Sequence, residues 1–542
     1  MLEIEESNSS RPVFLLKGRQ SHYLMQVDEN GGLRHHAWGL SRDSSSISAW
    51  TTDLAPPGHF ANEANFQEVY PFGETTSALP SLVVSLGADC GIEAIKEDAP
   101  NLPVRSLDLI YQSHQIQPES HPAGATAHGR PSRNPRPETL EIILCDRTAP
   151  VELSLFYRCY EDCDIIERWC ELRNQTSGTI EVDRISFATW SLPLGDYRVS
   201  TPTGQIFGEF QMQQVDLPRG LTLTARSGNL TSSHRANPAV LCTDRADPAR
   251  VFFAALAYSG NWRIEVESLD AGCVRVHGGE DDIDTRFELA PGESHRTHSF
   301  FAGCSGKGEN DAASKLHRLQ REYLQINTGP RPVLYNSWEA TGFDLSAQQQ
   351  MALADKAAAI GVELFVVDDG WFGGRRHDRE GLGDWRVSAE VFPQGLNPLI
   401  EHVHRLGMRF GIWFEPEMVN PDSDLYRAHP DWVLHYPGAA RTLQRNQLIL
   451  DFGRPEVVDH IESQLIAFLD AHPVEFIKWD MNRLAHPAGS VSGRAIWRRH
   501  VEGVYRIMDT LRGRYPGLSL QSCSAGGGRV DLGMAQRVEQ FW

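Results

Sequence analysis

After Pro330 the chain alternates between short apolar runs and longer amphipathic runs, and this alternation limits its fold more than any other feature. Helices are expected at 345–361, 397–407 and 455–472, the first of them capped by Ser346. Repeated strand–helix units predict a parallel sheet. The expected strands are the runs PVLYNSW, ELFVVDDGW, RFGIWFEPE, QLILDFG, EFIKWD and LSLQSCSAGGG.

Polar and aromatic residues collect where these expected strands end. A (β/α)8 barrel builds its site at the C-terminal ends of its strands. A doubly wound sheet is the alternative, but it usually confines its ligand groups to a switch point between a few strands. The pattern therefore favours a (β/α)8 barrel over residues 330–542.

The first part of the chain follows a different pattern, with short alternating strands and Gly/Pro/Asp turns. Asn30-Gly31-Gly32 separates two strand-like runs and predicts a hairpin. Residues 1–308 are expected to form a large β-sandwich, and 309–329 a connecting helix. The Pro-, Gly- and Ser-rich segment 118–137 is expected to be an exposed loop.

Composition and the pattern of charged and apolar residues limit which binding partners and which cellular compartment are expected. The formal charge of −20 argues against nucleic acid or an anionic membrane as a partner. The N-terminus lacks the pattern of a signal peptide, and no apolar run approaches the roughly 20 residues of a membrane helix. The nine cysteines are scattered without a CxxC pair, which favours reduced thiols in a cytoplasmic protein.

The run FIKWDMNR carries the most specific chemical signal. Apolar residues lead into Lys478, Asp480 and Asn482, which a strand would place on one face. A cation two residues from a carboxylate keeps it ionised and nucleophilic. Asp480 is therefore the candidate nucleophile, and it needs a second proton-handling group.

Other strand ends offer candidate ligands for a sugar. Asp368 and Asp369 can accept hydrogen bonds from hydroxyl groups, although helix-cap or salt-bridge roles would also explain such a pair. Trp338 and Trp413 can present flat apolar faces to a sugar, although core filling is the commoner role. Arg445 can hydrogen-bond a sugar hydroxyl or orient a carboxylate, and a purely structural ion pair would explain it equally well.

Two carboxylates and a glycine-rich run complete the set of candidates. Glu415 and Glu417 rival Asp480 for the catalytic role, but they rank below it because Pro416 between them suggests a turn that directs one of them away. The run from Cys523 through Gly526 permits a backbone turn against a ligand. It does not form the GxGxxG of a dinucleotide site, and there is neither HExxH nor a Cys/His cluster, so neither a cofactor nor a metal is expected.

These motifs resemble the α-galactosidases of glycoside hydrolase family 36. The resemblance covers essentially all of residues 330–542 in family order, and the sandwich half resembles the family more weakly. The matching runs are KWDMNR, NSWEATGFD, VVDDGWFG, GDW, FPQGL, GIWFEPEMVNPDSDLY, HPDW, RNQLILDF and CSAGGGRVDLGM, with YPFGE and DIIERWCELRN in the sandwich.

The resemblance implies a retaining exo-α-galactosidase of the melibiose or raffinose type, with Asp480 as nucleophile. It implies that the Asp pair holds the 4- and 6-hydroxyls, and that Asn482 and the Cys523–Gly526 loop hold the side with the 2-hydroxyl. It also implies a dimer or tetramer in which the sandwich can reach a neighbour's site, although 61–69 departs from the usual pattern. The substrate-binding positions it assigns are Trp338, Asp368, Asp369, Trp413, Arg445, Lys478, Asn482, Cys523 and Gly526.

The run VEQFW is interpreted as the start of a seventh strand of an incomplete barrel. In the family the acid/base follows this Trp, so it is expected roughly three residues past Trp542, with Asp531 an unfavoured substitute. The rivals are an α-N-acetylgalactosaminidase or a galactosyl transferase on the same scaffold, and a non-catalytic sugar-binding protein. Comparing the hydrolysis of an aryl α-galactoside with that of an aryl α-N-acetylgalactosaminide distinguishes a galactosidase from an α-N-acetylgalactosaminidase. The intact candidate nucleophile argues against a non-catalytic sugar-binding protein.

Overall fold

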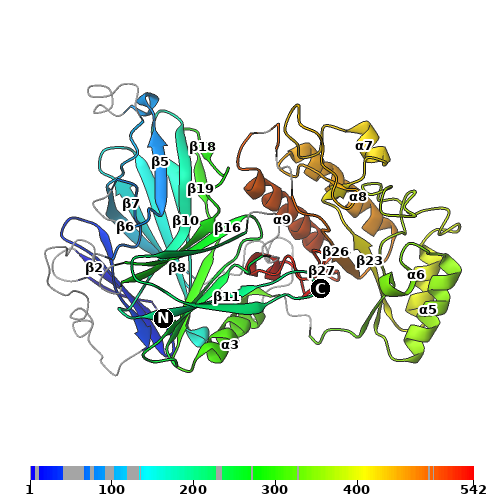
Figure 1. Ribbon diagram of the computed structural model, residues 1–542, viewed down its shortest axis with the longest axis horizontal. Helices are drawn as coiled ribbons and strands as arrows, with labels where there is room; N and C mark the ends of the chain where they lie inside the picture. The colour runs from blue at the N-terminus through cyan, green and yellow to red at the C-terminus, as the bar shows by residue number, and fades with distance from the viewer. Residues whose placement is uncertain are drawn as a thin grey trace.

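The computed structural model describes most of the 542-residue chain. The described residues are 2–6, 11–40, 66–73, 78–91, 103–118, 134, 136–227, 235–269, 273–325, 329–485, 489–491 and 493–542. Most of the expected loop at 118–137, and residues 61–65 of the departing segment, lie outside them. In Figure 1 a β-rich half occupies one side of the molecule and a mixed helix–strand half the other.

The β-rich half contains three antiparallel sheets. The largest runs β12-β11-β14-β15-β20-β9-β8-β7-β6, with β19 beside β9. Its strands are β6 (Leu109–Gln117), β7 (Thr139–Asp146), β8 (Val151–Tyr160), β9 (Ile165–Asn174), β11 (Tyr197–Thr203), β12 (Gln211–Asp216), β14 (Ala239–Asp244), β15 (Val251–Leu256), β19 (Ser294–Arg296) and β20 (Phe300–Ser305).

A second sheet and a smaller one complete the sandwich. The second sheet runs β13-β16-β17-β10-β18, with β5 on β10. Its strands are β5 (Leu82–Leu86), β10 (Ile180–Leu192), β13 (Thr222–Ser227), β16 (Trp262–Ser268), β17 (Val274–Glu280) and β18 (Phe287–Leu289). The smaller sheet holds β1 (Leu2–Glu6), β2 (Pro12–Lys17), β3 (Ser21–Val27) and β4 (Leu33–Leu40). Gly31, at φ +88°, lies in the turn that joins β3 to β4, as the sequence predicts.

Helix α3 (Glu309–Leu319) follows the sandwich and continues as a π-helical turn, η5 (Gln320–Leu324). Ala312, Leu319 and Tyr323 are buried in a cluster with sandwich residues such as Phe253 and Phe301. The predicted connecting helix is therefore packed onto the sandwich as an integral part of its surface.

The second half is built on six parallel strands in the order β21-β22-β23-β26-β27-β28. They are β21 (Leu334–Asn336), β22 (Leu364–Val367), β23 (Arg409–Phe414), β26 (Phe476–Trp479), β27 (Ser519–Ser522) and β28 (Gln540–Phe541). Within the described residues this sheet is an open row with β21 and β28 at its edges. The expected fold class, a β-sandwich followed by an incomplete (β/α)8 barrel, is confirmed.

One expected strand does not join this sheet. In QLILDFG only β25 (Leu448–Ile449) is extended, and it pairs antiparallel with β24 (Met418–Val419). The turn at Arg445-Asn446 reverses the chain just before it, so β25 returns along β24 and β23 pairs directly with β26. The prediction of a parallel strand at QLILDFG is wrong for this reason. The run VEQFW accordingly forms the sixth strand of the described sheet, β28, and is not the start of a seventh.

Helices cover the parallel sheet at the positions that the sequence predicts. Ser346 caps α5 by accepting a hydrogen bond from the Gln349 amide, and Gly361 ends it at φ +87°. The helices of this half are α4 (Trp338–Thr341), α5 (Ala347–Ala359), α6 (Asn397–Arg405), α7 (Asp424–Ala428), α8 (Pro455–Ala471), α9 (Ile496–Arg514) and α10 (Leu532–Ala535). None of the helices among the described residues is both long and apolar enough to cross a membrane.

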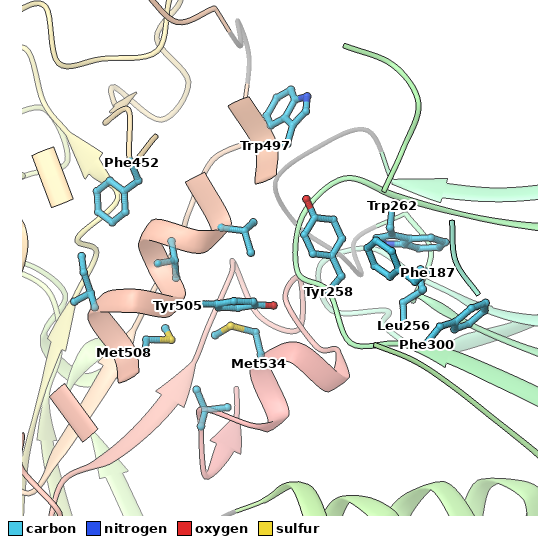
Figure 2. Packing of buried hydrophobic residues seen from close by; sticks show 14 of the residues in the cluster. Phe187, Leu256, Tyr258, Trp262, Phe300, Phe452, Trp497, Tyr505, Met508 and Met534 are labelled. Carbon is cyan, nitrogen blue, oxygen red and sulfur yellow. The ribbon is translucent and has the colours of Figure 1, made fainter. Parts of the chain in front are cut away.

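The two halves meet along α9 and α10. Figure 2 shows Tyr505 and Met534 on the barrel side of this seam, facing Tyr258 of the sandwich. The Tyr505 hydroxyl lies 2.6 Å from Ser259 Oγ, which donates to Asp531 Oδ1 at 2.8 Å. Asp531 also caps α10, because the same oxygen accepts from the Gly533 and Met534 amides.

Candidate active site

Asp480 lies one residue past the end of β26, at the C-terminal edge of the parallel sheet. Its amide donates to the Phe414 carbonyl at 2.8 Å, which continues the pairing of β26 with β23. Its Oδ1 accepts from the Met481 amide at 2.9 Å. The side chain is 5% exposed.

Two side chains fix the other oxygen of Asp480. Trp413 Nε1 donates to Oδ2 at 3.0 Å, and Asn482 Nδ2 donates to the same atom at 2.7 Å. Trp413 comes from the adjacent strand β23 and Asn482 from the segment after β26. The Asp480 carboxylate therefore has a fixed orientation. Strand β26 ends at Trp479, so the position of Asn482 beside Asp480 is set by the segment after the strand and not by the strand alternation that the sequence predicts.

The electrostatic surroundings keep Asp480 ionised. Burial by itself would raise the pKa of this carboxyl, since it disfavours the charged form. The Lys478 charge and hydrogen bonds from Trp413, Cys523 and Asn482 outweigh burial, and the pKa lies below its ordinary value. An ionised, oriented and shielded carboxylate is suited to nucleophilic attack.

Lys478 contacts Asp368 directly and acts on Asp480 through its charge. Its Nζ donates to Asp368 Oδ2 at 2.8 Å, and Asn336 Nδ2 donates to the same oxygen at 2.6 Å. Burial would lower the Lys478 pKa, but Asp368 and Asp480 hold it above its ordinary value. The Trp542 ring lies 4.1 Å from Lys478 Nζ, so this aromatic residue adjoins the site.

Asp369 is paired with an arginine that the sequence analysis does not single out. Arg375 donates to Oδ1 and Oδ2 of Asp369 at 2.9 and 2.7 Å, and its Nη1 donates to Asn420 Oδ1 at 2.9 Å. Burial raises the Asp369 pKa despite this partner. The signal that could have identified Arg375 was the need of two adjacent buried carboxylates for separate cations.

Glu415 is completely buried and contacts the segment that follows the nucleophile. Its Oε1 accepts from the Asn482 amide, and Gln447 Nε2 lies 2.9 Å from its Oε2. Burial, and then the charge of Asp480, raise the pKa of Glu415 to about 8. Glu415 thus supports the segment that carries Asn482.

Two further carboxylates have structural roles. Glu417 accepts two hydrogen bonds from Arg529, at 2.8 and 3.0 Å, and others from Trp479 and His500. Its burial would raise the pKa, but the Arg529 charge holds it far below the ordinary value. Asp531 caps α10 at the seam. These partners agree with the low rank of both as catalytic candidates.

The remaining predicted residues differ in exposure. Arg445 is exposed, and at φ +52° it forms a tight turn with Asn446 at φ +59°. Such values are strained for residues other than glycine and recur at functional sites. Trp338 starts α4 and is half-buried, whereas Trp413 is 1% exposed, so its ring is covered and its N–H makes the contact with the site.

The loop after β27 lies next to the nucleophile. The Cys523 amide donates to the Trp479 carbonyl at 2.8 Å, and Ser524 Oγ donates to the Met481 carbonyl at 3.1 Å. Gly526 has φ +92°, which explains the need for glycine there. Within the part of the chain that the structure describes, no group of His, Cys, Asp and Glu side chains could hold a metal ion.

Family models match both halves of the chain. The model described as "Glycosyl hydrolase family 36 N-terminal domain" matches residues 42–290, and "Melibiase" matches residues 294–542. The chain is 34% identical to alpha-galactosidase AgaA of Geobacillus stearothermophilus over 99% of its own length and 74% of that protein. It is 31% identical to alpha-galactosidase Mel36A of Lactobacillus acidophilus over 100% of its length and 74% of the relative.

Solved structures agree with these matches. The crystal structure of AgaA superposes with a TM-score of 0.88 at 33% identity, covering 98% of this chain and 74% of AgaA. The galactosidase domain of AgaSK superposes with a TM-score of 0.88 at 32% identity, covering 100% of this chain and 74% of the AgaSK chain.

A β-sandwich joined to a parallel α/β barrel, with an oriented carboxylate among buried polar side chains at its strand ends, defines a glycoside hydrolase. The chain belongs to glycoside hydrolase family 36.

Proposed function

We propose that the chain is a retaining exo-α-galactosidase that removes terminal α-D-galactosyl residues from oligosaccharides of the melibiose and raffinose type. The observation that carries the proposal is the Asp480 carboxylate, held by Trp413 and Asn482 and kept ionised by Lys478. Variants of the relative AgaA were crystallised with stachyose and with raffinose, which supports this substrate class.

In the proposed mechanism Asp480 attacks the anomeric carbon, and the bond from that carbon to the leaving oxygen breaks as this oxygen takes up a proton from the acid/base. The covalent galactosyl-enzyme is then hydrolysed by water, so the configuration is retained. Asp368 and Asp369 accept hydrogen bonds from sugar hydroxyls, with Lys478 and Arg375 fixing their positions. The acid/base expected past Trp542 stays a prediction.

The remaining predicted ligands have supporting roles in this proposal. Asn482 and the Cys523–Gly526 loop face the side of the sugar next to the anomeric carbon. Trp338 and Arg445 both keep part of their surface accessible, and in this proposal they contact the sugar at the entrance to the site. We also propose a homo-oligomer in the cytoplasm; the nine free thiols, eight of them buried, fit a reducing compartment.

The experiment that tests the proposal is intact-mass spectrometry after treatment with a slow fluorosugar α-galactoside, followed by peptide mapping. The expected result is the mass of one fluorinated galactosyl group added to the peptide that contains Asp480, with loss of the leaving group of the reagent. Labelling of another carboxylate, or labelling by the 2-acetamido analogue alone, would overturn the assignment of the nucleophile or of the substrate.

A further inference from the structure

A turn of the sandwich reaches the loop beside the nucleophile. Residues 204–210 connect β11 to β12, and in Figure 1 β11 extends from the sandwich toward β27. Within this turn, Glu209 Oε1 accepts a hydrogen bond from the Gly527 amide at 3.0 Å. A carboxylate from the N-terminal half therefore lies on the loop that follows β27.

The glycines of that loop make room for Glu209. A Cβ atom on Gly526 would lie 2.8 Å from Glu209 Oε1, and one on Gly527 would lie 3.0 Å from Glu209 Cγ. Real Cβ atoms essentially never come as close as the first of these. The glycine-rich run thus accommodates a side chain from the sandwich as well as its own turn.

The turn that carries Glu209 has a specific shape. Phe207 and Phe210 have φ values of +64° and +58°, which are uncommon for aromatic residues. A Cβ atom on Gly204 would lie 2.6 Å from Glu209 Cα, so the two ends of the turn are in close contact. Gln211 Nε2 donates to the Glu209 carbonyl at 3.2 Å. Local strain of this kind is retained where a site needs it.

The position of the loop indicates what Glu209 would meet. The loop begins at Cys523, which hydrogen-bonds to Asp480. A nucleophile bonded to C1 of a sugar has only C2 and the ring oxygen as the next atoms along the ring. The ring oxygen offers no proton, whereas a hydroxyl on C2 both donates and accepts. A carboxylate oxygen held beside this loop can accept the proton of that hydroxyl.

We propose that Glu209 determines specificity for the substituent at C2, accepting a hydrogen bond from a 2-hydroxyl and occupying the space that a 2-acetamido group needs. This inference rests on the proposed function, since it places C1 of an α-galactoside at Asp480. It assigns to the sandwich a residue of the sugar-binding site.

The test is calorimetric titration with 1-deoxygalactonojirimycin, an iminosugar crystallised with a variant of the relative AgaA, and with its 2-deoxy and 2-acetamido analogues. The proteins are the wild type, Glu209→Ala, Glu209→Gln and the surface control Glu288→Gln. We expect wild type and control to prefer the hydroxyl compound over the 2-deoxy one by about tenfold or more. Glu209→Ala should reduce this preference by about tenfold and strengthen binding of the 2-acetamido compound.

Glu209→Gln separates recognition from a merely structural contact. Its amide oxygen can still accept from the Gly527 N–H, so a structural role would be rescued, whereas the charge-assisted bond to the hydroxyl would be lost. The inference is overturned if Glu209→Gln keeps the wild-type preference, or if Glu209→Ala weakens all three ligands equally. If the wild type binds none of them, the proposed function fails as well; if it binds them and the preference is unchanged in both variants, only this inference fails.

Discussion

The Arg375 guanidinium holds the Asp369 carboxylate by two parallel hydrogen bonds of 2.9 and 2.7 Å, and neither residue is more than 3% exposed. Lys478 holds the neighbouring Asp368 through a single hydrogen bond of 2.8 Å. Each of two adjacent buried carboxylates thus has its own cation, which keeps both in place despite their mutual repulsion.

Breaking the first of these pairs should cost stability. Arg375→Met leaves Asp369 buried without a cation, so we expect a loss of about 3 to 5 kcal/mol in the free energy of unfolding. Adding Asp369→Asn should recover much of that loss, because the uncompensated charge is removed. Urea unfolding of both variants measures this. Equal stability of the single and the double variant would show that the charge of Asp369 is not the cause.

Asp369→Asn alone should weaken sugar binding and also lower the stability, because it leaves the buried Arg375 guanidinium without its carboxylate partner. The charge-assisted bond to a hydroxyl is replaced by a neutral one, so transition-state stabilisation should fall by about 1.5 to 3 kcal/mol. Affinity for 1-deoxygalactonojirimycin reports the binding part of this effect. Unchanged affinity would exclude Asp369 as a ligand of the sugar.

Asp480→Asn should abolish covalent labelling and lower turnover of an activated α-galactoside by about 10³-fold or more. Asparagine keeps the shape of the side chain, so the melting temperature should be retained. Asp459→Asn, at an exposed position on α8, is the matched control. Labelling of Asp480→Asn at the wild-type rate would remove this residue from the role.

Trp413→Phe should shift the acid limb of the pH profile. The variant loses the Nε1 hydrogen bond to Asp480 but keeps most of the ring packing. That bond favours the ionised form, so its loss raises the Asp480 pKa toward the ordinary value. The nucleophile must be ionised, and the variant should therefore lose its labelling rate at a higher pH than the wild type. Coincident acid limbs would contradict this account.

Glu415→Gln should change the pH dependence of stability. The Glu415 pKa is raised from 4.5 to about 8, so the folded state binds this proton more tightly than the unfolded state does. The stability it contributes is complete below about pH 4.5 and is lost as pH rises toward about 8. The melting temperature of the wild type should therefore fall more steeply over this window than that of Glu415→Gln. Parallel curves would mean that Glu415 is ionised when buried.

The surroundings of Gln447 are consistent with a protonated Glu415. Gln447 Oε1 has no hydrogen-bond partner among the described residues, while its Nε2 faces Glu415 Oε2. Turning the amide by half a rotation would let a protonated Glu415 donate to Oε1.

The sequence predicts the elements of the barrel half well, because helix caps and apolar periodicity are local. Ser346, Pro398 and Gly407 mark helix ends as expected. The exception is QLILDFG, whose composition fits a central strand, while the turn at Arg445-Asn446 needs positive φ at residues other than glycine. Its pairing is decided by that turn and not by the apolar residues.

The site is predictable where it depends on one strand end and hidden where it depends on contacts between distant segments. Lys478, Asp480 and Asn482 are close together in sequence, and the structure brings them together with Asp368 and Trp413. Arg375 and Glu209 are not recognisable in this way. Two adjacent buried carboxylates imply a cation for Asp369, but nothing local distinguishes Arg375 from the neighbouring arginine. The partner of Glu209 lies in the other half of the chain, and no local pattern specifies that contact.

The link between Ser259 and Asp531 has a consequence for the order of events during synthesis. The sandwich leaves the ribosome first and can fold as a unit before the barrel segments appear. Its Ser259 hydroxyl then offers a ready partner to the residue that starts α10, and Tyr505 joins the same hydroxyl. The barrel segments would thus fold against the surface of a sandwich that is already folded, and that surface would serve as their template.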